Sequence, residues 1–371
     1  MGARVSLLEL LRRLPKDRFQ PIVACHKDGD LSEALRDAGI EVRRVLYRNY
    51  RKGKYLPLIP YSIFRLALMI RREGIRLVHS NEFWVNPYGI WACRFSSAWP
   101  ICHFRTSRTP QELPAKKLKQ YKVHNANRLI LVSPIQEEHF RDIPELAGRI
   151  RIVPNGVDLN RFRQPVSSPE LKRELGWLQH RLVGLLGSIS PHKGHDHFIQ
   201  AIPAILTRHP NVKFLIVGEP RPVDYIDHCQ QLAASLAIGP DVLRFLPFYK
   251  DPVPVYQSLD ILVCPSQKEA FGRVNIEAMA CGVPVVAYPV GGIPFVLRGG
   301  RGGILVNDQT PAGLAAAISG LLQDPQRMTA MGQQGMAEVR ERFDIEVHAQ
   351  HIAAIYDEVL AEAQGIAATE D

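Results

Sequence analysis

The sequence predicts an α/β protein with two parallel sheets, each covered by helices. Short apolar runs rich in β-branched residues alternate with amphipathic helical stretches, which is the pattern of parallel sheets. The chain has 371 residues, more than one ordinary hydrophobic core holds. The alternation also stops near residues 154–180, a stretch rich in Pro, Asn and Ser, and then restarts. We therefore expect two domains joined by a linker in this stretch.

The apolar runs mark the strands that we expect in each half. In the first half they lie at 20–25, 41–46, 76–79, 100–104 and 128–132. In the second half they lie at 181–187, 212–217, 242–246, 260–264 and 284–287. Helices are expected at 57–73, at 112–125 and through the tail from 310 to 363. The chain opens with a further helical pattern that ends at Pro15 and presents Val5, Leu8, Leu11 and Leu14 on one face.

The composition is that of a soluble globular protein, with 46% hydrophobic and 22% charged residues. No apolar stretch has the length of a transmembrane helix or the form of a secretory signal, so we expect a cytoplasmic protein. The six cysteines form no C-x-x-C pair, which argues against a zinc site and against a disulfide framework. The D-x-D motif at 28–30 lies in an early acidic loop, and we interpret it as structural.

The net charge of +9 is unevenly distributed. Residues 1–150 carry 27 Lys and Arg against 14 Asp and Glu, whereas residues 151–371 carry 19 against 23. The basic first half suits a phosphorylated or otherwise acidic partner, or an anionic membrane surface. A solvated basic surface is the alternative. No nucleic-acid partner is expected, because the chain has no helix-turn-helix, zinc-finger or aromatic RNA-binding signature.

The loop after the strand at 181–187 is a candidate binding site, because ligands of such sheets bind beyond the carboxyl ends of the strands. Its sequence is GSISPHKGHDHF, in which Gly187 and Gly194 allow close backbone approach. Lys193 stands directly before a predicted helix, and a lysine beside a helix N-terminus suits a phosphate or diphosphate. A solvated loop lysine is the alternative, since the P-loop pattern is absent.

The loop after the strand at 260–264 is the second candidate. It leads into KEAFGRVNIEAMACG, with Glu269 in the loop and Glu277 in a predicted helix. Two carboxylates that converge above a sheet can accept hydrogen bonds from the vicinal hydroxyls of a sugar or ribose. The amides of Phe271 and Gly272, near the helix N-terminus, can face a diphosphate. In the alternative interpretation, Glu277 pairs with an arginine and Glu269 only caps the helix.

Several motifs, in order along the chain, resemble the retaining nucleotide-sugar glycosyltransferases of family 4. PSQKEAFGRVNIEAMACGVPVVA is similar to that family's Glu-x7-Glu signature, RIVPNGVDLNRF to its interdomain segment, and GSISPHKG to its phosphate loop. The resemblance covers nearly the whole chain. It implies the GT-B fold, in which two Rossmann-like domains face a cleft. The acceptor-binding domain would span 1–163, with a helix at 344–363 packing back on it, and the donor-binding domain would span 164–343.

The resemblance also implies roles for donor-side residues. Glu277 would bind the ribose hydroxyls of the donor, Glu269 would contact the transferred sugar, and Lys193 would neutralise the diphosphate leaving group. The same pocket would be lined by Gly187, Ser188, Phe271, Gly272, Gly291 and Gly292. Most relatives carry an arginine where this chain has Ser188, so Arg273 or His192 is a candidate to assist Lys193.

In the first domain, the resemblance points to the end of the strand at 100–104. His103 would face the donor sugar as a catalytic residue beside Lys193 and Glu269, and a packed strand-end histidine is the alternative. Weaker candidates for the acceptor side are Asn81, Glu82 and Arg105. Gly2-Ala3 aligns with the end of the family's first glycine-rich loop, so we expect the family's first strand to lie upstream of residue 1. Mass spectrometry that found a fully active native protein beginning at Met1 or Gly2 would contradict this expectation.

The resemblance implies a retaining glycosyltransferase that moves a hexosyl unit from a nucleoside-diphosphate sugar to an acceptor hydroxyl in cell-surface glycan or glycolipid synthesis. No metal or other cofactor is expected. The basic groups at 43–54 and 116–122 suit an acidic or lipid-linked acceptor at the inner face of the cytoplasmic membrane. The alternative is a sugar-nucleotide-binding or regulatory GT-B protein that has lost transfer, to which Ser188 lends support.

Overall fold

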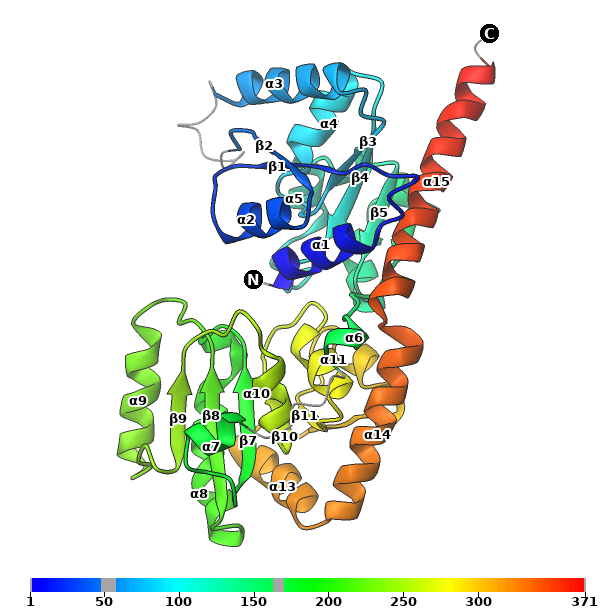
Figure 1. Cartoon of the computed structure of the whole chain (residues 1–371). Helices are drawn as coiled ribbons and strands as arrows, with labels where there is room; N and C mark the ends of the chain where they lie inside the picture. Colours follow the sequence, from blue (N-terminus) through cyan, green and yellow to red (C-terminus); the bar gives the residue numbers. More distant parts are fainter. Residues whose placement is uncertain (1, 48–57, 163–169, 370–371) are drawn as a thin grey trace. The chain divides into compact units, whose positions relative to one another are not determined.

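The computed structural model describes residues 2–47, 58–162 and 170–369, and the chain divides into two compact units (Figure 1). Unit 1 comprises Met1–Gly156 and Ile345–Asp371, and unit 2 comprises Val157–Asp344. The boundary between the units lies inside the stretch at 154–180, where a linker was expected, and the described part of this stretch also contains α6 (Leu159–Phe162) and α7 (Glu170–Glu174). These residues belong to unit 2 because Leu171 and Trp177 bury their side chains there.

Unit 2 contains one parallel sheet of six strands. The strand order is β12-β11-β10-β7-β8-β9, and every neighbouring pair is parallel. The strands are β7 (Arg181–Leu186), β8 (Val212–Val217), β9 (Leu243–Leu246), β10 (Ile261–Cys264), β11 (Val285–Ala287) and β12 (Gly303–Leu305). Sequence analysis missed only β12 in this sheet, because a strand of three residues that begins with a glycine and follows Gly-Arg-Gly does not form an apolar run.

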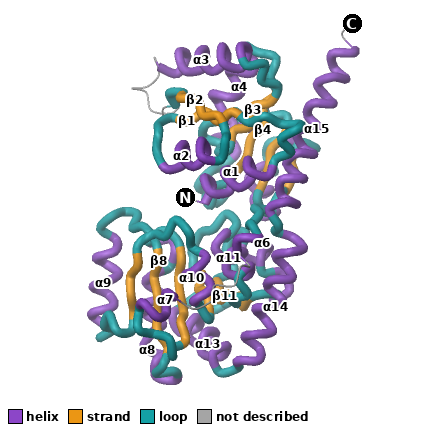
Figure 2. Tube along the Cα trace, in the orientation of Figure 1, coloured by secondary structure: helices purple, strands orange, loops and turns teal. Residues whose placement is uncertain are grey.

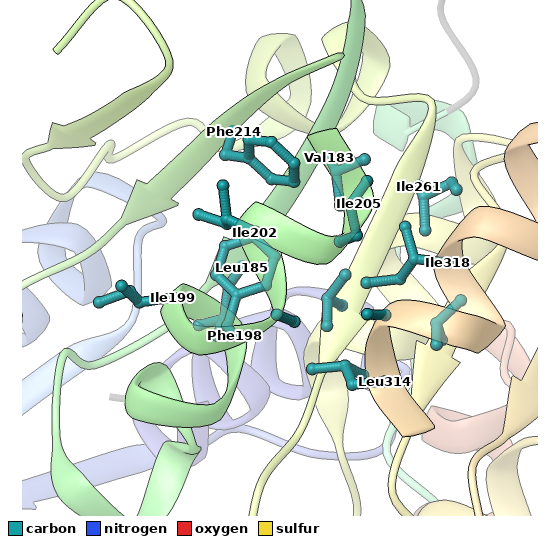
Figure 3. Packing of buried hydrophobic residues seen from close by; sticks show 14 of the residues in the cluster. Val183, Leu185, Phe198, Ile199, Ile202, Ile205, Phe214, Ile261, Leu314 and Ile318 are labelled. Carbon is teal, nitrogen blue, oxygen red and sulfur yellow. The ribbon is translucent and has the colours of Figure 1, made fainter. Parts of the chain in front are cut away.

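Helices pack on this sheet through apolar stripes (Figure 3). On α8 (His195–Arg208), the buried residues Phe198, Ile202 and Ile205 recur at helical spacing and face the strands. α13 (Pro311–Leu322) packs beside α8. Thr310 caps its N-terminus, because the Thr310 side chain accepts a hydrogen bond from the Gly313 amide. The other helices of unit 2 are α9 (Tyr225–Ser235), α10 (Val253–Ser258), α11 (Arg273–Ala280), α12 (Ile293–Val296) and α14 (Pro325–Arg342), and two 3-10 turns are η5 (Pro191–Lys193) and η6 (Arg298–Gly300).

Unit 1 contains a four-stranded sheet and a separate pair of strands. The sheet has the order β3-β4-β5-β6, and β1 pairs with β2; all the pairs are parallel. The strands are β1 (Ile22–Cys25), β2 (Glu41–Arg44), β3 (Leu77–Ser80), β4 (Trp99–Phe104), β5 (Arg128–Leu131) and β6 (Ile150–Ile152). The sequence did not predict β6, because Arg151 interrupts its apolar residues.

The described helices of unit 1 surround these strands (Figure 2). They are α1 (Gly2–Arg13), α2 (Asp30–Asp37), α3 (Leu58–Arg72), α4 (Asn86–Arg94), α5 (Ala115–Gln120) and α15 (Ile345–Thr369), with 3-10 turns η2 (Val123–Asn125), η3 (Pro134–Phe140) and η4 (Pro144–Leu146). The helix expected at 112–125 is therefore shorter and ends in a separate turn, because Lys122 adopts the left-handed conformation (φ 56°). On α1, Leu11 is buried as expected, but Val5 and Leu8 are only half-buried.

The last helix, α15, packs on α1 and β4 within unit 1. Its buried residues Ile352, Tyr356 and Val359 recur at helical spacing and join the core that also holds Leu10. An ion pair adds to this contact. The side chain of Arg128 on β5 is buried, and its Nη2 lies 2.8 Å from Oε1 of Glu358 on α15. No helix in the part of the chain that the structure describes is both long and apolar enough to cross a membrane.

Candidate active site

The loops after β7, β10 and β11 meet at the carboxyl edge of the unit 2 sheet. The Gln267 amide, after β10, donates to the carbonyl of His192, after β7, at 2.8 Å. The Gly292 amide, after β11, donates to the carbonyl of Glu269 at 3.3 Å. The donor-side residues expected from the sequence therefore lie in one cluster of loops, which is where ligands of parallel sheets bind.

Lys193 and Glu269, both expected to act on the donor, form an ion pair. Lys193 Nζ lies 2.5 Å from Glu269 Oε2, and both side chains are largely buried. Burial lowers the pKa of the Lys193 ammonium, but the Glu269 carboxylate outweighs it and holds that pKa above its ordinary value. The lysine is therefore charged at neutral pH, and a charged lysine can neutralise a diphosphate.

The pairing of Glu269 contradicts the interpretation in which this residue caps a helix. α11 begins after Gly272, which has φ 90°, and within the described residues no side chain caps it. Glu269 instead contacts a lysine from another loop. The N-cap residue Gly272 has no side chain that could occupy the amides of the first turn of α11, and a helix N-terminus favours an anion.

Glu277 is held by two neighbours in the interior of unit 2. It is 8% exposed, and its Oε1 and Oε2 accept hydrogen bonds from Arg273 Nε at 2.6 Å and Tyr256 Oη at 2.7 Å. The arginine pairing of the alternative interpretation is therefore present. Burial raises the pKa of Tyr256 well above its ordinary value, so its hydroxyl remains a donor. A carboxylate has about four acceptor positions, so Glu277 retains capacity for ligand hydroxyls.

Glycines permit the loops to approach this closely. Gly291 has φ 52°, and a Cβ at that position would lie 1.7 Å from the carbonyl oxygen of Glu269. A side chain on the neighbouring Gly292 would meet Ala270 O at 2.5 Å. Any larger residue at Gly291 would push the loop after β11 away from Glu269.

The loop after β7 carries a serine, Ser188, where the sequence resemblance implied an arginine. Gly187 and Ser188 follow the strand directly, and the Ser188 hydroxyl lies 3.3 Å from that of Ser190. Arg273, a candidate to assist Lys193, is bound to Glu277, whereas His192 is exposed beside Lys193. The ring of Phe271 is buried, so this residue can offer a ligand only its backbone amide.

Sequence reasoning did not single out Asn275 of α11. Its side chain is fully buried, and both amide atoms lack a hydrogen-bond partner among the described residues. The side chain lies next to Gly272, since a Cβ on that glycine would come within 2.6 Å of Asn275 Nδ2. A polar residue between Arg273 and Glu277 on an otherwise apolar helix is the signal that could have identified it.

In unit 1, His103 of β4 belongs to a buried hydrogen-bond network. Its Nδ1 lies 3.1 Å from Arg105 Nη2 and 3.3 Å from His79 Nε2, and His79 Nδ1 lies 2.6 Å from Tyr356 Oη of α15. A guanidinium only donates, so His103 Nδ1 accepts and its proton resides on Nε2. His79 must then donate through Nε2 and accept from Tyr356 through Nδ1. His103 Nε2 is buried and has no partner among the described residues.

The two imidazoles of this network are neutral. Burial lowers the pKa of His79 to about 3, and burial together with Arg105 holds the pKa of His103 well below its ordinary value. His79 and Tyr356 were not identified from the sequence. The signal for His79 was its place at the end of the strand expected at 76–79, which pairs with the strand that carries His103. Tyr356 lies far along the chain and gave no such signal.

We expect both rings to remain neutral, with the proton on Nε2, at every pH from 5 to 8. Long-range proton–nitrogen correlation spectra of the uniformly labelled protein measure this directly, because the nitrogen shifts report the tautomer. Protonation of Nδ1 in His103, or titration of either ring above pH 5, would contradict the network. Tyr356→Phe removes the donor to His79 and is expected to mix the tautomers of that ring.

The weaker acceptor-side candidates lie near the same strand ends. Asn81 Nδ2 donates to the carbonyl of Ala3 at 3.2 Å, so this amide group binds α1. Burial raises the pKa of Glu82 to about 7, although Arg105 lowers it. Arg105 also donates to Asn155, a residue of the interdomain motif. Among the described residues, no group of three or more His, Cys, Asp or Glu side chains could hold a metal ion.

Solved structures with the same architecture include glycosyltransferases. Anabaena Alr3699/HepE in complex with UDP and glucose has a TM-score of 0.85 and 24% identity, over 96% of each chain. WaaG, a glycosyltransferase of lipopolysaccharide biosynthesis, has a TM-score of 0.74 and 16% identity, over 95% of each chain. These likenesses show that the fold is GT-B, as the sequence resemblance implied.

Sequence comparison identifies the family. The model of Glycosyltransferase Family 4 matches residues 1–161, and that of Glycosyl transferases group 1 matches residues 180–324. The D-inositol 3-phosphate glycosyltransferase of Nocardia farcinica is 32% identical over 333 residues, 79% of this chain and 71% of the relative. That of Corynebacterium efficiens is 31% identical over 328 residues, 80% of this chain and 74% of the relative.

The fold and the family models define the protein as a glycosyltransferase. More narrowly, this chain belongs to glycosyltransferase family 4, within the glycosyl transferases of group 1.

Proposed function

We propose that this enzyme transfers a hexosyl unit from a nucleoside-diphosphate sugar to an acceptor hydroxyl, with retention of configuration at the anomeric carbon. The observation that carries the proposal is the buried pair of Lys193 and Glu269 on loops that meet beside the N-terminus of α11. A cation and a helix N-terminus favour a diphosphate, and a carboxylate beside them favours sugar hydroxyls.

The chemistry follows from where charge develops. When the bond between the anomeric carbon and the phosphate oxygen breaks, its electron pair passes to the diphosphate. Lys193 and the amides at Phe271 and Gly272 stabilise that charge, which lowers the barrier. The acceptor oxygen attacks from the face that the diphosphate leaves, and its proton passes to the departing phosphate oxygen. Glu269 holds the transferred sugar and does not act as a nucleophile, unlike the carboxylates of retaining glycosidases.

The remaining donor contacts are proposed from the geometry of each unit. Glu277, oriented by Tyr256 and Arg273, accepts from the ribose hydroxyls. The backbone at Gly187, Ser188, Gly291 and Gly292 borders the same loops. In unit 1, His103 Nε2–H is a donor for a hydroxyl of the transferred sugar. Lys193 supplies the charge that a divalent ion supplies in other transferases, so activity is expected to survive chelators.

The proposed acceptor is acidic or lipid-linked, and the proposed location is the cytoplasm with peripheral attachment to the inner face of the membrane. The excess basic charge of residues 1–150 supports an acidic partner. Asn81, Glu82 and Arg105 are the acceptor-side candidates. The names of the curated relatives, which specify a phosphorylated inositol, support an acceptor that carries phosphate. This acidic acceptor fits synthesis of a cell-surface glycan or glycolipid.

A binding or regulatory protein without transfer is the second candidate. It is favoured by Ser188, which brings no charge to the loop where the sequence resemblance implied an arginine. The two candidates differ in turnover but not in donor binding. Both predict a thermal shift with nucleoside diphosphates, and only the transferase releases free nucleoside diphosphate from a nucleotide sugar.

The experiment is a thermal-shift screen of UDP, GDP and ADP and their sugars, followed by turnover with phosphate-bearing acceptors. UDP-glucose is the first donor to test, because the structure of Anabaena HepE was solved with it. A ligand at 100 times its dissociation constant stabilises the folded protein by about 2.7 kcal/mol. Product with retained configuration, and unchanged rates in EDTA, would support the proposal. A shift without product would support the second candidate, and no shift with any nucleotide would contradict both.

A further inference from the structure

Helix α3 has two faces of different chemistry. One face carries Ile59, Leu66 and Ile70, which are buried against α4 and share a hydrophobic cluster with Ala98, the residue before β4. The opposite face carries large apolar side chains in solvent: Leu58 is 40% exposed, Tyr61 55% and Phe64 65%. Three of the eleven exposed large apolar side chains of the described chain therefore lie within two turns of one helix. Such a group marks an interaction surface.

The exposed face is also basic. Successive residues of a helix are separated by about 100°, which places Tyr61, Phe64, Arg65, Leu68 and Arg72 within an arc of about 100°. Arg71 borders the arc, and α3 contains no Asp or Glu. None of these three arginines pairs with a carboxylate in the described part of the chain. We define the outer face of α3 as Leu58, Tyr61, Phe64, Arg65, Leu68, Arg71 and Arg72.

We propose that the outer face of α3 docks the enzyme on an anionic lipid bilayer, with the aromatic rings at the boundary between headgroups and acyl chains. This inference deepens the proposed membrane partner by naming the surface that makes the contact. A helix with aromatic and aliphatic residues between unpaired arginines is the form of a helix that lies in the membrane interface. Anionic headgroups supply the negative counter-charge that no described carboxylate supplies to the three arginines.

The same features argue against a second copy of the chain as the occupant. In a twofold-symmetric contact, the outer face of α3 would meet itself, so the arginines of both copies would face each other without an acidic partner. The helix lies along an edge of unit 1, next to α4, and is not recessed behind other helices of that unit (Figure 1). The exposure of Tyr61 and Phe64, 55% and 65%, leaves both rings open to a bilayer.

The test is flotation of the full chain with two kinds of vesicle. One is phosphatidylcholine alone, and the other contains about a third phosphatidylglycerol. We expect binding to the anionic vesicles only, weakened by added salt. Tyr61→Ser with Phe64→Ser is expected to reduce the binding constant at least about tenfold. Replacing Arg65, Arg71 and Arg72 with Gln is expected to reduce it roughly 100-fold, since each basic residue contributes roughly fivefold.

Two control variants match the α3 variants in the number of apolar residues or arginines removed, and therefore in net charge. Val223→Ser with Leu178→Ser removes two exposed apolar residues elsewhere, and Gln at Arg208, Arg327 and Arg340 removes three exposed arginines of unit 2. Both controls are expected to bind within about twofold of the parent. Equal binding of the parent to neutral and anionic vesicles, or equal losses in the α3 variants and the controls, would overturn the proposal. A dimer in sedimentation that the α3 variants dissolve, without vesicle binding, would also overturn it in favour of self-association.

Donor binding separates this inference from the proposed function. The α3 variants are expected to keep the thermal shift with the nucleotide that stabilises the parent, because α3 contributes none of the proposed donor residues. Nucleotide binding without vesicle binding would overturn the docking surface and leave the transferase proposal intact. Vesicle binding without any nucleotide response would support the docking surface and contradict the transferase proposal.

Discussion

Lys193→Ala is expected to lower kcat/KM for the nucleotide sugar by about 100- to 1,000-fold. The loss is of this size because the ammonium stabilises charge that develops on the diphosphate only as the bond breaks. The effect is therefore expected mainly in kcat, with a smaller change in KM. Steady-state kinetics with the donor identified by thermal shift, at saturating acceptor, measures both constants.

The Lys193 variant also leaves Glu269 buried without its partner, which costs about 3 kcal/mol of folding free energy or more. Thermal unfolding therefore accompanies the kinetics. Lys193→Met combined with Glu269→Gln removes both charges, so it is expected to regain stability but not activity. Lys213→Ala is the matched control, because this lysine lies at the amino end of β8, against Trp177. Parent-like kcat in the Lys193 variants would show that another group neutralises the leaving group.

Glu277→Gln is expected to raise KM for the donor at least about tenfold, with less change in kcat, because ribose binding is common to the ground and transition states. The same change is expected to destabilise the fold by about 2–4 kcal/mol. The reason is that Gln can accept from Arg273 or from Tyr256 but not from both as the carboxylate does, and the buried guanidinium loses its counter-charge. Donor titrations and thermal unfolding of the same preparation measure the two effects.

Glu338 of α14 offers a matched control for Glu277. It is 3% exposed and pairs with Arg342 four residues later, just as Glu277 pairs with an arginine four residues earlier on α11. Glu338→Gln is expected to destabilise the fold by a similar amount and to leave the donor KM unchanged. If both variants raised KM equally, the effect of Glu277 would be structural and the proposed ribose contact would be wrong.

Most strands could be predicted because their signal is local. Runs such as those of β8 and β10 are apolar on both faces, as parallel strands between two layers of helices must be. β6 and β12 were missed because each has only three residues and carries an arginine or a glycine. The boundary between the units lies inside the stretch expected to join them, at Gly156. That the later part of this stretch folds into unit 2 was not predictable, because isolated apolar residues, such as Trp177, bury there without forming a periodic pattern.

The candidate site was predictable as a set of positions but not as a set of contacts. Loops that follow neighbouring parallel strands must meet at one edge of the sheet, so the order of strands and loops along the chain is enough to group Lys193, Glu269 and Glu277. That Lys193 pairs with Glu269, and that Tyr256 orients Glu277, depended on how the loops close. Asn275 escaped notice because an unpaired buried amide is visible only when its surroundings are known.

The sequence by itself determined the alternation of strands and helices, the family motifs and the basic first half, because each depends on residue type and on spacing along the chain. Only the tertiary structure decided which carboxylate meets which cation. It also decided that Arg105 donates to His103 Nδ1 and so places the proton of His103 on Nε2, that His79 links His103 to Tyr356 of the last helix, and that the outer face of α3 is exposed to solvent. Those outcomes depend on contacts between residues far apart in the chain, which no local pattern encodes.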